Sequence, residues 1–60
     1  MTKLYAAQKL LEHGPLTLRE FLQITRWSYD TARSTLRNLM LDGRVTADRI
    51  GPRLCAYRLS

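Results

Sequence analysis

Arginine is the residue type of this sequence that is best suited to bind another molecule. The 60 residues contain ten lysines and arginines against five acidic residues, which gives a net charge of +5. The excess lies in residues 26–60, which carry +4, whereas residues 1–25 carry only +1. Every cation of residues 26–60 is an arginine, whose planar guanidinium pairs with phosphate and with the edge of guanine. The charge therefore indicates either a nucleic-acid partner or a solvated basic surface.

Residue types that carry out catalysis or bind metals are scarce. The sequence has one histidine, His13, and one cysteine, Cys55, and it contains neither a glycine-rich phosphate loop nor a metal-ligand spacing. We therefore expect that the protein is not an enzyme and uses no cofactor or metal. A single cysteine cannot form an internal disulfide, and small domains of oxidising compartments usually carry several, so we expect a reduced, cytoplasmic protein. Cys55 is expected to be a buried small apolar side chain.

The length and the hydropathy pattern indicate one small domain over residues 1–60. A chain of this size buries only about 60% of the surface that its unfolded form exposes, so its core has to be compact. The apolar runs are far shorter than the roughly 20 residues that span a bilayer, and no apolar stretch follows Lys3. We therefore expect neither a membrane segment nor a secretory signal.

Three helices are predicted to position the arginines, over about residues 3–12, 18–24 and 29–41. Each range has apolar residues at three- and four-residue steps, which is the spacing of one helix face. Thr2, Thr17 and Ser28 precede the three ranges as N-caps. Glu20 completes a capping box with Thr17, which is a strong local signal for the start of a helix.

Two glycine-containing segments end helices, and the second of them begins a hairpin. His13-Gly14-Pro15 stops the first helix, and Asp42-Gly43 stops the third. The apolar period then changes to two, which predicts two strands within residues 44–59, joined by a Gly-Pro turn. Cys55 falls on the second strand, on the same side as Tyr57. In the third helix, a stripe of apolar residues is predicted to face the core: Ala32, Leu36, Leu39 and Met40.

The segment of residues 18–36, followed by Leu39 and by residues 43–45, resembles the winged helix-turn-helix regulators. The similarity covers residues 4–59 and includes the small bacterial and phage-type members, among them the pilus-operon phase-variation regulators. It implies an α+β, mostly α fold in which three helices are followed by a two-stranded β-hairpin wing. It also implies that Trp27 packs inward, that the third helix reads DNA in the major groove, and that the wing contacts adjacent backbone or the minor groove.

Arg26 departs from this pattern, because many of these regulators have a glycine in the turn between the second and third helices. A positive φ at this position costs an arginine about 1 kcal/mol of backbone strain. Any other φ means a different type of turn. The departure leaves the angle between the two helices open.

Nine residues are predicted to contact DNA, most of them on the outer face of the third helix. They are Arg26, Ser28, Tyr29, Thr31, Arg33, Ser34, Arg37, Arg49 and Arg53. Arg33 is the first candidate for a bidentate contact to guanine, worth about 1–3 kcal/mol of discrimination, and Arg37 for a phosphate contact. The resemblance implies the role of Arg49 and Arg53 in the wing. The alternative for each of these residues is an ordinary solvated surface position.

We expect a sequence-specific transcriptional regulator that binds double-stranded DNA, as a homodimer formed on the DNA or as tandem copies on adjacent half-sites. The alternative is a winged-helix interaction module that binds another regulator or a polymerase subunit, which an exposed apolar patch of Trp27, Ile50 or Leu41 would favour. RNA binding is a third option, which no sheet of paired aromatic residues supports. The DNA interpretation requires that the arginines of the third helix and of the hairpin share one surface and are not paired with acidic residues.

Overall fold

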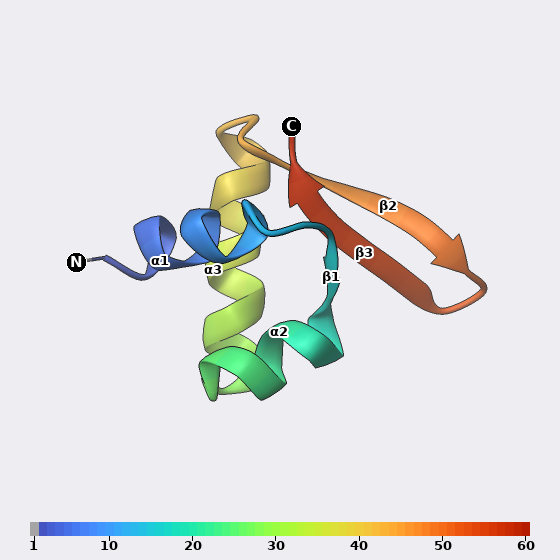
Figure 1. The fold of residues 1–60 in the computed structure, drawn as a ribbon, viewed down its shortest axis with the longest axis horizontal. Helices are drawn as coiled ribbons and strands as arrows, with labels where there is room; N and C mark the ends of the chain where they lie inside the picture. The colour runs from blue at the N-terminus through green and yellow to red at the C-terminus, as the bar shows by residue number, and fades with distance from the viewer. Residues whose placement is uncertain (1) are drawn as a thin grey trace.

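The computed structural model describes residues 2–60, which form an α+β fold of three helices and a three-stranded antiparallel sheet (Figure 1). In chain order the elements are α1 (Lys3–Leu11), β1 (Leu16–Thr17), α2 (Leu18–Thr25), α3 (Tyr29–Leu41), β2 (Val45–Gly51) and β3 (Leu54–Leu59). The three predicted helices and the two predicted hairpin strands are confirmed. Within the described residues, no helix is long and apolar enough to cross a membrane.

The three helices begin at the predicted N-caps. The Thr2 hydroxyl accepts from the Tyr5 amide, and the Ser28 hydroxyl accepts from the Thr31 amide. At α2 the capping box is complete, since the Glu20 amide donates to the Thr17 hydroxyl at 3.2 Å and the Thr17 amide donates to the Glu20 carboxylate at 3.0 Å. These bonds satisfy amides that the helix itself leaves unpaired, so the local sequence fixes where each helix starts.

The turn between α2 and α3 contains a left-handed residue. Arg26 has φ 62° and ψ 17°, and its amide donates to the Leu22 carbonyl at 2.9 Å. This is the conformation that costs an arginine about 1 kcal/mol. The next residue, Trp27, packs edge-to-face on Phe21 with ring centroids 5.5 Å apart, so the predicted inward packing of Trp27 is confirmed. The turn places α3 across α2 (Figure 1).

The core is a small cluster shared by the three helices and the start of β2. Its buried side chains are Ala7, Leu11, Phe21, Ala32, Leu36, Leu39 and Val45. The predicted inward stripe of α3 is right for three of its four members and wrong for Met40, which is 41% exposed. Thr35 is buried in its place, and its hydroxyl donates to the Thr31 carbonyl at 2.8 Å. That bond gives the buried hydroxyl an acceptor and so offsets the cost of burying it.

The sheet has one strand more than predicted. Its order is β1-β3-β2, with Leu16 opposite Tyr57 and Thr17 opposite Ala56. The hairpin has the two strands expected, but the expected fold lacked the third strand of the sheet, β1. A strand of two residues shows no alternating pattern, and β1 forms because the chain leaving α1 passes along the free edge of β3.

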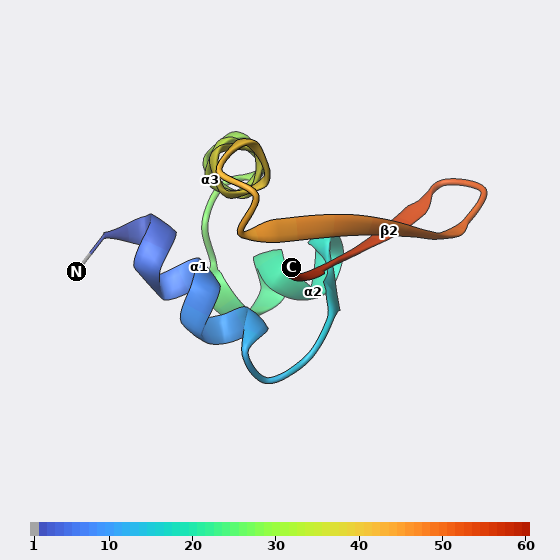
Figure 2. The same cartoon turned by 90° about the horizontal axis from the view of Figure 1, so that it is seen from above.

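The register of the hairpin, β2 with β3, gives each sheet face its own residues. Val45 pairs with Leu59, Ala47 with Tyr57 and Arg49 with Cys55, so these six residues share one face. The hairpin extends well beyond the helices (Figures 1 and 2). Cys55 lies in this extended part and is exposed, so the prediction that it is buried was wrong. The hairpin continues past the core that would have covered it.

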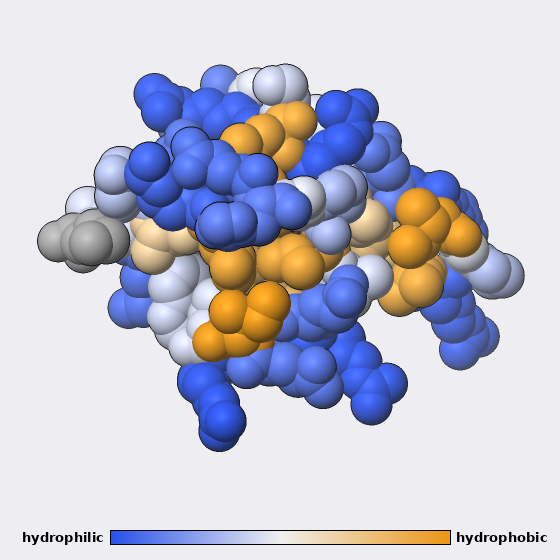
Figure 3. Space-filling view, viewed as in Figure 1, coloured by the Kyte–Doolittle hydropathy of each residue, from blue (hydrophilic) through white to orange (hydrophobic). Residues whose placement is uncertain are grey.

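Several large apolar side chains remain exposed on different elements. Ile24 lies near the end of α2, Leu41 at the end of α3, and Ile50 and Leu54 near the hairpin tip. Figure 3 shows one apolar area over the hairpin and another near the centre of the same face. The exposed apolar surface is thus divided among several places.

Candidate nucleic-acid interface

A groove runs between α3 and the hairpin, and we call it the α3–hairpin groove. It consists of two adjoining hollows that share Arg33 and Tyr57. Towards the end of α3 the first hollow is also lined by Ser34, Leu36, Arg37 and Met40. Towards the hairpin tip the second is also lined by Leu18, Tyr29, Arg53, Leu54 and Cys55. Because Arg33 and Tyr57 belong to both hollows, the two hollows lie next to each other between α3 and the hairpin.

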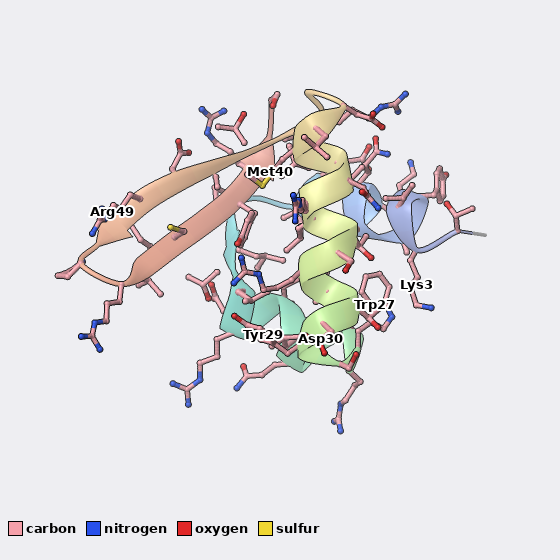
Figure 4. All side chains as sticks on the ribbon, turned by 180° about the vertical axis from the view of Figure 1, so that it is seen from behind. Lys3, Trp27, Tyr29, Asp30, Met40 and Arg49 are labelled. Atoms are coloured by element: carbon pink, nitrogen blue, oxygen red, sulfur yellow. The ribbon has the colours of Figure 1, made fainter. Side chains whose placement is uncertain are left out.

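The helix and strand periods decide which side chains of each element face the groove. Tyr29, Arg33 and Arg37 are spaced four residues apart and therefore lie along one side of α3. Tyr57 and Cys55 alternate along β3 and face the same side of the sheet. Figure 4 shows α3 and the hairpin side by side, with Tyr29 at the start of α3 and Met40 between the helix and the hairpin.

Arg33 is held by its neighbour on the helix. Its Nη1 donates to the Tyr29 hydroxyl at 2.9 Å, and its guanidinium carbon lies 5.6 Å from the centre of the Tyr29 ring. The bond to Tyr29 raises the pKa of Arg33 above its ordinary value, and the charge interactions with Tyr29 and Tyr57 act in the same direction. Arg33 therefore presents a fixed positive charge where the two hollows meet.

Within residues 2–60, the arginines of the groove form no ion pair with an acidic side chain. Among residues 2–60, the ion pairs are Lys9 with Glu12 on α1, and Asp48 with Arg58 on the hairpin. Neither pair includes Arg33, Arg37 or Arg53, and all three of these residues are exposed. The positive charge of the groove is consequently not neutralised within the described part of the chain.

Arg49 shares the sheet face of Cys55 but is engaged at the hairpin tip. Its Nη2 donates to the Pro52 carbonyl at 2.8 Å and its Nε to the Gly51 carbonyl at 3.3 Å. Figure 4 shows Arg49 far out on β2, away from α3. These bonds hold Arg49 against the turn that carries Arg53, so its positive charge lies at the hairpin tip.

The structure brings together five of the nine predicted residues in the groove: Tyr29, Arg33, Ser34, Arg37 and Arg53. Arg26, Ser28 and Thr31 do not line it. The hydroxyls of Ser28 and Thr31 bond to each other at 2.9 Å and serve the N-terminal cap of α3.

Tyr57 and Met40 line the groove although they were not predicted as site residues. The alternation along β3 puts Tyr57 on the same face as Cys55, and this pattern could have identified Tyr57 as a site residue. No such signal marked Met40, because its position depends on how far the hairpin leans towards α3.

Comparison with known proteins assigns no family to this chain. A scan of protein-family models, a search of curated proteins and a search of solved structures each gave no match. The features that bear on function are therefore the charge, exposure and geometry of the α3–hairpin groove.

Proposed function

We propose that this protein is a winged helix-turn-helix transcriptional regulator that binds double-stranded DNA sequence-specifically. In this proposal α3 lies in the major groove, and the hairpin is the wing that contacts adjacent backbone or the minor groove. One observation carries the proposal: Arg33 lines two adjoining hollows between α3 and the hairpin, with Arg37 in the first and Arg53 in the second. None of the three forms an ion pair within residues 2–60.

The shape of α3 supports this placement. It has 13 residues, and the major groove of B-DNA, about 12 Å wide, admits one α-helix. Its N-terminal half carries the exposed side chains of Tyr29, Asp30 and Arg33, and recognition helices contact base edges mostly from this half. The short turn from α2 and the hairpin that follows α3 match the order of elements in winged helices.

The size of the surface favours two copies on one duplex. A single module of this kind buries only about 600–1,000 Å² of protein surface on DNA, which gives modest affinity. Adjacent half-sites supply a second set of contacts, so we propose that two protomers, or tandem copies, occupy one operator.

Selection of bound duplexes from a random library tests the proposal. We expect enrichment of a defined sequence, and a binding constant whose logarithm falls with log salt at a slope near −5, as about five phosphate contacts per protomer predict. Replacing both Arg33 and Arg37 by alanine should abolish the enrichment. The matched control, Lys3→Ala with Lys9→Ala, removes the same charge from α1 and should retain it. Affinity that is equal for all sequences, or indifferent to salt, contradicts the proposal.

A second candidate function is an interaction module for another regulator or a polymerase subunit. The exposure of Leu41, at 76%, and of Ile50, at 57%, favours it. Leu41 ends α3 and Ile50 lies near the hairpin tip, however, and Trp27 packs against the core, so the three residues do not make one patch. Stoichiometric capture of a protein by the wild-type chain but not by Leu41→Ser, with no duplex retained, would decide for this function.

A further inference from the structure

Arg33 and Arg37 both line the groove from α3, but their surroundings differ. The Arg33 guanidinium is bonded to the Tyr29 hydroxyl and lies near the Tyr29 ring. The hydrogen bonds found in residues 2–60 give the Arg37 guanidinium no such partner on the helix. The Arg33 guanidinium is therefore directed by a contact on its own helix, whereas the Arg37 guanidinium has no such contact within residues 2–60.

The contact to Tyr29 leaves most donors of Arg33 available. A guanidinium carries five N–H groups, and in the described residues only Nη1 is used, on the Tyr29 hydroxyl. The edge formed by Nε and Nη2 has no protein partner there. Two parallel donors are what the O6 and N7 atoms of guanine require for a bidentate contact.

We infer that Tyr29 is a positioning residue that holds the Arg33 guanidinium with its Nε–Nη2 edge free, and thereby makes Arg33 the side chain that discriminates guanine. The inference rests on the proposed function, and it goes further by dividing the two arginines into a base reader, Arg33, and a phosphate contact, Arg37. Ordering a long side chain opposes binding, and a side chain that is already ordered avoids most of that loss.

The first experiment is made without DNA. The side-chain nitrogen resonances of Arg33 report how fast its guanidinium rotates about the Nε–Cζ bond. In the wild-type protein we expect slow rotation, and in Tyr29→Phe, which lacks the hydroxyl, faster rotation. Tyr5→Phe is the matched control, because Tyr5 lies 5.6 Å from the Lys9 ammonium in the same four-residue arrangement on α1. Equal rotation in wild type and Tyr29→Phe overturns the inference.

The second experiment measures discrimination on the selected duplex. The readout is the ratio of dissociation constants for duplexes with 7-deazaguanine, which lacks N7, and with guanine at the contacted position. We expect Tyr29→Phe to lower this ratio about fivefold, near the lower end of what one bidentate pair supplies, and Tyr5→Phe to keep it. In an Arg33→Ala background, Tyr29→Phe should change nothing further, because its effect passes through Arg33.

Two results of this experiment overturn the inference. If Tyr29→Phe lowers the ratio equally with and without Arg33, Tyr29 contacts DNA itself and does not act by positioning. If the ratio is the same in wild type and Tyr29→Phe, the hydroxyl has no part in reading guanine. Failure of the proposed function is a separate result: the wild-type chain then selects no duplex, whereas the rotation of Arg33 still shows whether Tyr29 holds it.

Discussion

Arg26 holds the turn between α2 and α3 in a backbone conformation that residues other than glycine rarely adopt. Because a glycine has no Cβ, Arg26→Gly should relieve this strain and stabilise the fold by up to about 1 kcal/mol. Urea unfolding measures the change. Gly43→Ala is the reciprocal control: Gly43 has φ 75° with nothing within 4 Å of an added Cβ, so this variant should lose about 1 kcal/mol from strain alone. If Arg26→Gly is less stable than wild type, the positive φ of Arg26 is not a source of strain.

Cys55 offers a chemical probe of the groove. Its thiol is exposed and lines the hollow that contains Arg33 and Arg53. We expect iodoacetamide to modify Cys55 in the folded protein, and we expect the bound duplex to slow the reaction because it covers the groove. Mass spectrometry over time follows the modification. The control is a duplex of unrelated sequence, with both duplexes tested at one high salt concentration at which only the selected sequence should stay bound. A rate that the selected duplex leaves unchanged would place DNA elsewhere on the molecule.

At the scale of the elements, the capping box makes the stability of α2 depend on pH. The Glu20 carboxylate accepts from the Thr17 amide and from the Thr17 hydroxyl, and these bonds lower the pKa of Glu20 below its ordinary 4.5. A carboxyl whose pKa is lower in the folded state stabilises the fold above its unfolded pKa. This contribution is lost as the pH falls from above 4.5 through the lowered folded value.

Glu20→Gln should therefore remove part of the decline in the free energy of unfolding below pH 4.5. The glutamine can still accept from the Thr17 amide, so the cap persists at neutral pH without the titrating charge. Denaturant unfolding across this pH range makes the comparison. Glu12→Gln, which removes a carboxylate outside the capping box, is the control, and an identical decline in Glu20→Gln and wild type would refute the argument.

At this scale, the sequence predicts the features that residues close together in the chain determine, such as helix caps. Thr2, Thr17 and Ser28 cap the helices as expected, because a cap needs only residues within one turn of the chain. Strand β1 was missed, because it forms by pairing with a strand about 40 residues away and has no pattern of its own. Periodicity put Arg33 and Arg37 on the outer face of α3, but it could not place the hairpin beside them.

The same limit explains the errors within the site. Cys55 was expected to be a buried small apolar side chain, but it lies on the part of the hairpin that extends past the helices (Figure 2). Met40 was predicted to face the core but is 41% exposed, and Thr35 is buried, because the neighbouring element decides whether a position at the edge of a helical stripe is covered. The sequence thus predicted which side chains each helix and strand would carry and where the helices begin. It did not predict that α3 and the hairpin lie side by side to form the groove.

At the scale of the whole molecule, α3 and the hairpin carry most of the positive charge: two arginines against one aspartate in α3, and three arginines against one aspartate in residues 45–59, give +3 of the net +5. These two elements are joined through the core at one end of the hairpin and separate towards its tip (Figures 1 and 4). A duplex that meets α3 and the hairpin together therefore contacts arginines from both, and the two sets should contribute differently to binding.

Arg53 and Arg33 provide the test of that difference. Arg53 lies at the turn of the hairpin. If it contacts phosphate or the minor groove as proposed, Arg53→Ala should weaken binding to all duplexes alike and reduce the salt slope by about one. Arg33→Ala should instead cost about 1–3 kcal/mol on the selected sequence and relax its specificity. Lys9→Ala removes the same charge from α1, outside the groove, and shows how much a change in net charge does by itself. If Lys9→Ala and Arg53→Ala weaken binding equally in titrations across salt concentrations, the attraction is a property of overall charge, and the hairpin makes no contact of its own.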